Sequence, residues 1–298
     1  MKKIFLGGLF VLALAGLSLA QSYQPQFEFN LFGGYALTSV KGTTAYTDTY
    51  SSYFGYFDPI TESTTIDLKS KNGLFFGGSF TYYFNPNFGL QLSAGFLNSD
   101  VPNTSTVTYT RLNNNNGQTY TDNFAWTGTG TLNSIPISLN LVARFGNDQL
   151  SGYVSGGPTL YLNSYQATSS FGYGIYDWGI QYIYPVYYFT DYIDLLQVGL
   201  EIPKTSWTGI GGNIGAGVTL NVSPSIGLSL DARYYLCPAK DLPWNFQLGD
   251  YNGVLNTLTG YSFTQDDADY VTGLGTLTTK VNPSFFKISA GLSFRFGN

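Results

Sequence analysis

Apolar and polar residues alternate with a period of two along most of the chain, and helical periodicity is scarce. Near the start, for example, Phe27, Phe29 and Leu31 alternate with Glu28 and Asn30. A period of two is that of β-strands, whose successive side chains point to opposite faces. The pattern predicts eight strands, at 27–37, 74–82, 88–96, 135–145, 150–162, 210–222, 226–234 and 286–296.

The connections between these strands alternate in length. Three are tight turns by their chemistry: Asn-Pro-Asn at 85–87, Gly-Asn-Asp at 146–148 and Ser-Pro-Ser at 223–225. Short turns on one side and long loops on the other are typical of outer-membrane barrels. We therefore expect four long polar extracellular loops, at about 41–72, 98–131, 163–206 and 236–283.

The first twenty residues have the three parts of a secretory signal peptide. Lys2 and Lys3 precede an apolar run over 4–17, and small residues at Ser18 and Ala20 make a cleavage site. The alternative is an anchoring helix, but a spanning helix needs about 20 apolar residues. We expect cleavage near Ala20, which leaves one barrel domain over 21–298, since no linker or composition break marks a second domain.

Composition separates a membrane barrel from a soluble sandwich, which also has one apolar face. Charged residues make up 10% of the chain, against about 25% in ordinary soluble proteins, and the face opposite the apolar stripe is mainly Gly, Ser, Thr and Asn. A narrow lumen favours such side chains. Aromatic residues near strand ends fit an interfacial girdle: Tyr82, Tyr83, Phe84, Phe88, Phe145, Phe294 and Phe296. The predicted fold is all-β, a closed antiparallel transmembrane β-barrel of about eight strands, or ten if 163–206 adds a hairpin.

Four segments carry a family resemblance: 135–141 (IPISLNL), 152–161 (GYVSGGPTLY), 212–218 (GNIGAGV) and 291–296 (GLSFRF). They resemble the outer-membrane β-barrel superfamily of OmpA-, OmpX- and OmpW-like proteins over about 27–296. The resemblance implies a bacterial outer membrane, lipid and lipopolysaccharide as neighbours, and the barrel-assembly machinery as a partner during insertion. That machinery reads a terminal aromatic residue in the family, whereas here Phe296 is followed by two more residues.

Candidate chemistry is sparse. The chain has no His. The familiar barrel enzymes resemble one another in using a His, so we expect that this chain is not an enzyme. We also expect no cofactor and no metal site. The net charge of −5 argues against nucleic acid. Glycines over 209–215 superficially resemble a nucleotide loop but alternate inside one strand. The carboxylates of Asp266, Asp267 and Asp269 are expected in a solvated loop, with weak cation binding as the alternative. Cys237 is expected to be a small side chain at a strand end.

Charged residues at inward positions are the candidate site. Charges in a confined interior are costly unless they are paired. Glu28 opens the first strand and Arg295 closes the last, so barrel closure would bring them to one level. We hypothesise a Glu28–Arg295 or Glu28–Arg144 pair that helps to plug the lumen; otherwise these side chains reach water unpaired. The predicted lumen charge network is Glu28, Arg144, Asp231, Arg233, Lys287 and Arg295.

Two functions follow from this reading. The first is a structural or surface-interaction barrel with a filled lumen, whose four long loops meet an extracellular partner. The aromatic residues within 163–206 would then form a contact surface or pack on one another. The second is a narrow transport barrel of the OmpW sort, which passes small hydrophobic molecules through a lateral opening. The two differ in whether the lumen is blocked or continuous.

Overall fold

The computed structural model describes residues 26–50, 57–113, 116–147, 149–183, 186–247 and 277–296. Within these residues no helix is long and apolar enough to cross a membrane. The strands are β1 (Gln26–Thr38), β2 (Lys41–Tyr50), β3 (Phe57–Lys69), β4 (Asn72–Tyr83), β5 (Phe88–Asp100), β6 (Asn103–Asn113), β7 (Thr119–Gly146), β8 (Leu150–Ile183), β9 (Val186–Asn221), β10 (Ile226–Leu236), β11 (Lys240–Pro243), β12 (Asn245–Gln247), β13 (Thr278–Val281) and β14 (Phe285–Phe296).

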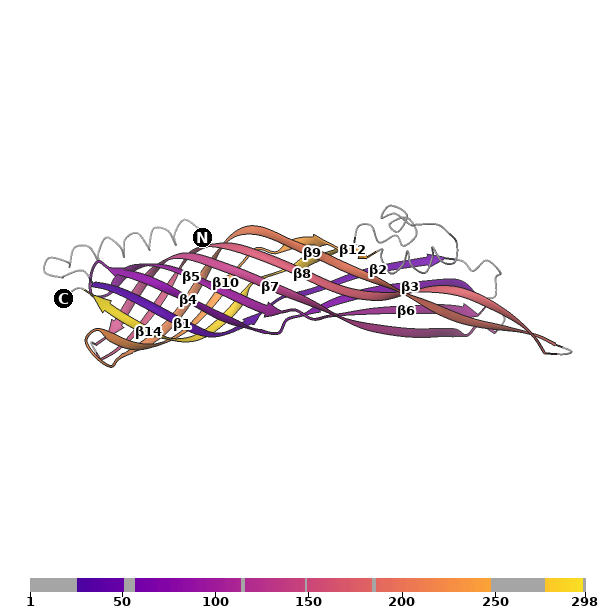
Figure 1. Cartoon of the computed structure of the whole chain (residues 1–298), viewed down its shortest axis with the longest axis horizontal. Coiled ribbons are helices and arrows are strands. Elements are labelled where there is room, and N and C mark those ends of the chain that lie inside the picture. Colours follow the sequence, from indigo (N-terminus) through magenta and orange to yellow (C-terminus); the bar gives the residue numbers. More distant parts are fainter. Residues whose placement is uncertain are drawn as a thin grey trace.

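Eight of these strands close into a ring. The order is β1-β4-β5-β7-β8-β9-β10-β14, and β14 pairs again with β1, so every neighbouring pair is antiparallel. The barrel and the eight predicted strands are confirmed (Figure 1). The ten-strand alternative is wrong, because 163–206 lengthens β8 and β9 beyond the ring instead of adding strands to it.

The outer face of the ring is apolar on all eight strands. Ile210 exposes 77% of its surface and Tyr35 65%. Each strand contributes at least one exposed aliphatic side chain, for instance Leu31, Leu74, Leu92, Leu139, Val154, Ile214, Leu230 and Ile288. So large and continuous an apolar surface is not stable in water, and closure satisfies the backbone groups that lipid would leave unpaired. The ring therefore has the surface of a membrane-spanning barrel.

The three predicted tight turns are confirmed at one end of the barrel. Asn85 Oδ1 accepts hydrogen bonds from the backbone N–H groups of Asn87 and Phe88, at 2.9 and 2.7 Å. Asn147 Oδ1 accepts hydrogen bonds from the backbone N–H groups of Gln149 and of Leu150, the first residue of β8, at 3.0 and 2.8 Å. The Ser223 hydroxyl accepts from the N–H of Ile226 at 3.1 Å. These side chains fix the turns because they replace backbone partners.

The predicted aromatic girdle is correct only in part. Phe145 and Phe296 are exposed on the outer face near this turn end, as is Tyr82. Tyr83, the next residue, is 4% exposed and faces inward, because successive residues of a strand point to opposite faces. Tyr82 therefore lies on the outer, apolar face of the barrel, whereas its neighbour Tyr83 faces the lumen.

At the other end, three of the four predicted loops are strands, so that expectation was wrong. Residues 41–72 include β2 and β3, residues 98–131 include β6 and the first half of β7, and 163–206 includes the continuations of β8 and β9. These strands pair in the order β2-β3-β6-β7-β8-β9 and run on from the barrel (Figure 1). The cause is threonine, which counts as polar but is β-branched and favours strands. We call this sheet the extension.

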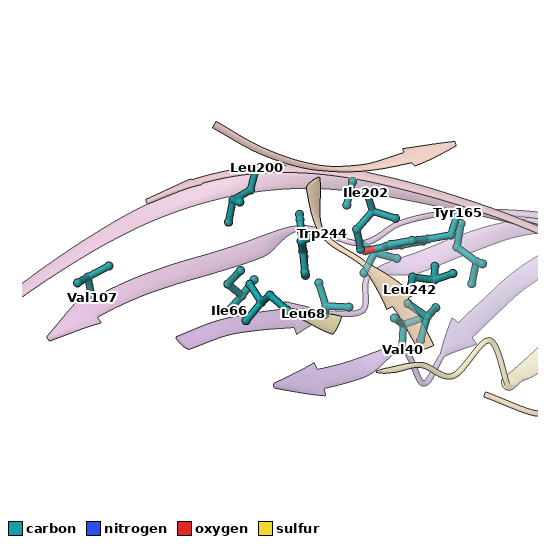
Figure 2. Packing of buried hydrophobic residues seen from close by; sticks show 14 of the residues in the cluster. Val40, Ile66, Leu68, Val107, Tyr165, Leu200, Ile202, Leu242 and Trp244 are labelled. Carbon is teal, nitrogen blue, oxygen red and sulfur yellow. The ribbon is translucent and has the colours of Figure 1, made fainter. Parts of the chain in front are cut away.

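The extension has its own hydrophobic core on its inner face. The fourth stretch, 236–283, contributes β11, β12 and β13, of which β11 and β13 pair with each other; residues 248–276 lie outside the described part of the chain. Trp244 packs among Leu68, Leu200 and Ile202 (Figure 2), and its indole N–H donates to Thr279 Oγ1 at 2.6 Å. The outer face carries exposed or half-exposed threonines such as Thr43, Thr106 and Thr127.

Candidate functional site: the filled lumen

A buried ion cluster crosses the middle of the lumen. Asp231 and Arg233 lie two residues apart on β10, so both point inward, and Lys287 on β14 is directly opposite Arg233 in register. Lys287 Nζ is 2.8 Å from Asp231 Oδ1, and Arg233 Nη2 is 3.4 Å from Asp231 Oδ2. The Tyr153 hydroxyl of β8 also donates to Asp231 at 2.8 Å. One carboxylate therefore lies between two cations that are 4% and 2% exposed, and the cluster keeps one positive charge in excess.

Amide side chains carry this cluster across to the opposite wall. Arg233 donates to Asn213 Oδ1 and to the Ser155 hydroxyl, each at 2.6 Å. Asn213 in turn donates to Asn140 at 2.7 Å, and Asn140 to Gln91 at 3.1 Å. The chain of bonds links β10, β9, β7 and β5, and charge-assisted and connected bonds of this kind fix the groups they join.

A second ion pair closes the turn end of the barrel. Glu28 and Arg295 are direct partners in the β1–β14 register, and Arg295 Nε lies 3.3 Å from Glu28 Oε2. Asn30 donates to Glu28 at 3.0 Å. Arg144, the other hypothesised partner of Glu28, instead lies over the Tyr83 ring, with its guanidinium carbon 5.4 Å from the ring centroid. Of the six predicted lumen charges, five thus lie in two ion-paired groups and Arg144 lies apart.

Aromatic rings fill the lumen towards the extension. Phe75, Tyr235 and Phe285 pack together, with centroids 4.5 to 6.0 Å apart, and all three are at most 2% exposed. Phe32 stacks on Phe75 at 6.0 Å. Lys287 Nζ is 4.0 Å from the centroid of Phe32, so its ammonium joins the ion cluster to the aromatic layer by a cation–π contact.

The space left between these layers is small. A cavity of about 20 Å³ lies among the ion cluster, Phe32 and Gln91, which is room for roughly one water molecule. Beyond the aromatic layer, the core of the extension continues the packed interior. The arrangement pairs buried charges and holds them in place at this level of the barrel.

Several functional residues were not singled out from sequence. Asn140, Asn213, Gln91 and Tyr153 occupy inward positions of their strands, and the alternation alone marks those positions. The sequence does not distinguish them from other lumen-facing residues, because uncharged polar residues are common on that face. Their role depends on which strands face each other across the lumen, and this is set only when the barrel closes.

The remaining candidates are placed as follows. Residues 209–215 lie inside β9, as expected. Cys237 follows β10 and is buried, where burial raises the pKa of its thiol to about 11. Asp266, Asp267 and Asp269 lie outside the described residues, and within those described no cluster of metal-ligating side chains occurs. The aromatic stretch within 163–206 falls largely on the outer parts of β8 and β9, whose side chains are likewise not described.

The chain is similar at low sequence identity to several solved outer-membrane proteins. The solved structure of OprG from Pseudomonas aeruginosa is 13% identical, with 91% of this chain and 96% of that chain covered and a TM-score of 0.42. Neisserial surface protein A is 14% identical (90% and 97% covered, TM-score 0.33), and the protease OmpT from Escherichia coli 9% identical (93% and 98%, 0.39). No family model and no curated protein matches.

The chain itself carries the features of a membrane barrel. Its strand order closes a ring of eight, its belt is apolar on every strand, and its lumen is polar and filled. The chain has the architecture of the eight-stranded outer-membrane β-barrels.

Proposed function

We propose that the protein is an integral barrel of a bacterial outer membrane that has a closed lumen and acts at the cell surface through its extension. The observation that carries this proposal is the filled lumen, in which an ion pair, an ion cluster and an aromatic layer follow one another. A barrel of eight strands has an interior just wide enough for side chains. A structural or surface-interaction role then fits better than conduction.

The two ends of the molecule support the proposed orientation. Short turns lie at one end and the extension at the other, which is the asymmetry of periplasmic turns and extracellular loops. In this proposal lipid and lipopolysaccharide surround the belt, the barrel-assembly machinery inserts the chain, and the extension meets an extracellular partner. The absence of His from the sequence favours a non-enzymatic role.

Single-channel recording in planar bilayers tests the closed lumen. We expect the reconstituted protein to give little conductance, and Glu28→Gln to raise the leak because it leaves Arg295 without its carboxylate. Asp67→Asn is the matched control, because Asp67 lies on the extension and bonds to Thr43 there. A steady open conductance of the unmodified protein, or an unchanged trace for Glu28→Gln, would count against the plug.

A narrow transport barrel is the second candidate, and one feature of the wall favours it. Pairing between β5 and β7 is interrupted between Ala94↔Ile137 and Leu97↔Ser134, on either side of Pro136. Proline has no N–H to donate to the ladder, so this seam is the place where a lateral opening would form. Selective uptake of an apolar solute into vesicles that contain the protein would support this candidate over the first.

A further inference from the structure

The ion cluster in the lumen carries a net positive charge. Asp231 supplies one negative charge, whereas Arg233 and Lys287 supply two positive ones. Glu28 is already paired with Arg295 at 3.3 Å, so that pair is balanced and offers no second carboxylate. The other acidic residues of the described strands lie in the extension or where it joins the barrel. One buried positive charge is therefore left without a counter-charge from the described residues, and such a charge is costly.

The small cavity of the lumen lies directly beside this excess charge. Its volume is about 20 Å³, and both Arg233 and Lys287 line it, so it has room for roughly one water molecule or one small ion. Lys287 Nζ also lies 4.0 Å from the centroid of Phe32, a contact that offsets part of the cost of burying the ammonium but supplies no negative charge. Hydroxyl groups from three strands complete the polar lining: Ser79 of β4, Ser93 of β5 and Ser229 of β10.

The three serine hydroxyls are available as hydrogen-bond donors. Ser79 Oγ accepts a long bond from Gln91 Nε2 at 3.4 Å, which leaves the O–H group of Ser79 unused. The side chains of Ser93 and Ser229 form no hydrogen bond with the described residues. A hydroxyl group supplies one donor and rotates to suit its partner. All three can therefore turn towards an acceptor that lies in the cavity.

The charge and the size of the cavity decide between its possible occupants. A water molecule would fill the space but would leave the positive charge, and phosphate or sulfate is larger than the space. A halide ion is small and monovalent, and it accepts bonds from charged N–H groups and from hydroxyls. Asp231 also lines the cavity, but Lys287 and the Tyr153 hydroxyl, each 2.8 Å from the carboxylate, offset its charge. The second cation, Arg233, remains for an added anion.

We infer that the lumen binds one chloride ion beside Lys287 and Arg233, with the serine hydroxyls of the cavity as its other ligands. Asp231 and the chloride then balance the two cations, so the buried network as a whole is neutral. The inference goes beyond the proposed function, although it rests on the same ion cluster. The two fail separately, because a conducting barrel can hold chloride and a closed barrel can lack it.

Equilibrium unfolding of the full chain in lipid vesicles tests for chloride, when sodium gluconate is replaced by sodium chloride at constant total salt. Gluconate is too bulky for the cavity, and constant ionic strength keeps screening equal. For one site, a tenfold rise in chloride above its Kd should raise the folding equilibrium constant about tenfold. Lys287→Met removes the excess charge and should abolish this dependence. Arg144→Gln is the matched control, because it removes one positive charge over Tyr83, away from the cavity.

A second variant, Ser93→Ala/Ser229→Ala, keeps every charge and should raise the chloride concentration needed for half of the effect. The inference is overturned if chloride changes the folding equilibrium constant of the unmodified protein by less than about twofold, since the excess charge is then relieved by loss of a proton. It is also overturned if Lys287→Met keeps the full dependence or Arg144→Gln loses it. Bromide-soaked crystals should show an anomalous peak beside Lys287, and its absence there contradicts the site. Conductance, measured in parallel, tests the closed lumen separately.

Discussion

Asp231→Asn is the most informative single change in the lumen, because it removes charge and keeps shape. The amide can still accept the Tyr153 hydroxyl. It leaves Lys287 and Arg233, both almost fully buried, with no carboxylate between them. At an effective dielectric constant of about 20, the gross attractions lost at 2.8 and 3.4 Å are about 6 and 5 kcal/mol. Most of that is offset by desolvation, and removing one partner of a buried pair costs about 3 to 5 kcal/mol net.

The assay must report on the barrel and not on the extension. Trp126, Trp207 and Trp244 all belong to the extension core or pack against it, so their fluorescence follows the wrong part of the molecule. Equilibrium unfolding in urea, with the protein in lipid vesicles and the folded fraction read from heat-modifiable migration on gels, measures the ring. We expect the free energy of unfolding to fall by 3 to 5 kcal/mol, the range for a broken buried pair.

A double-mutant cycle separates charge from packing. Lys287→Met removes one uncompensated ammonium, so Asp231→Asn/Lys287→Met should recover about 1 to 3 kcal/mol relative to Asp231→Asn alone. A cost below about 1 kcal/mol for Asp231→Asn, typical of exposed pairs, would refute the reasoning. So would a double variant that is no more stable than the single one.

Three further changes test other parts of the fold. Gly34→Ala should prevent folding on gels, because its Cβ would lie 2.0 Å from a β14 carbonyl oxygen, whereas Gly33→Ala, with its nearest atom at 3.9 Å, should fold normally. Tyr165→Phe should raise extension stability by about 1 kcal/mol at neutral pH, since the buried Tyr165 hydroxyl has no partner in the described residues. Burial raises the pKa of Tyr165, so the folded state holds the Tyr165 proton more tightly than the unfolded state does. The stability that the protonated ring contributes is present below the ordinary pKa of 10.0 and is lost as the pH rises above that value. Fluorescence-monitored melts of Tyr165→Phe should therefore show less alkaline destabilisation than those of the unmodified protein. Trp244→Phe loses the bond to Thr279 and should cost about 1 to 2 kcal/mol in the same melts.

Alternation of side chains was enough to predict the barrel strands, because each has one face in lipid and one in the lumen. It was not enough for the extension. Along 104–110, threonine and serine occupy the outer positions and part of the inner ones, so only Val107 and Tyr109 mark an apolar face. Composition suggested a loop there, while the β-branched side chains favoured a strand.

The candidate site divides in the same way. The Glu28–Arg295 contact follows from the two ends of the chain meeting when the ring closes, so it could be proposed from sequence. The bonds from Arg233 to Asn213 and on to Asn140 could not, because they depend on which side chains reach across the lumen at one level. That depends on strand stagger, which no local pattern encodes.

The length of β8 determines how far the extension reaches from the barrel. From Gln166, near the barrel rim, to Ile183 the strand continues for 183 − 166 = 17 residues, roughly 55 Å at about 3.3 Å per residue. The ladder with β9 is paired through this stretch with one register shift. A paired ribbon keeps its reach where a loop of equal length would coil. Under the proposed surface role, a partner bound at the tip of this ribbon would stand that far from the end of the barrel.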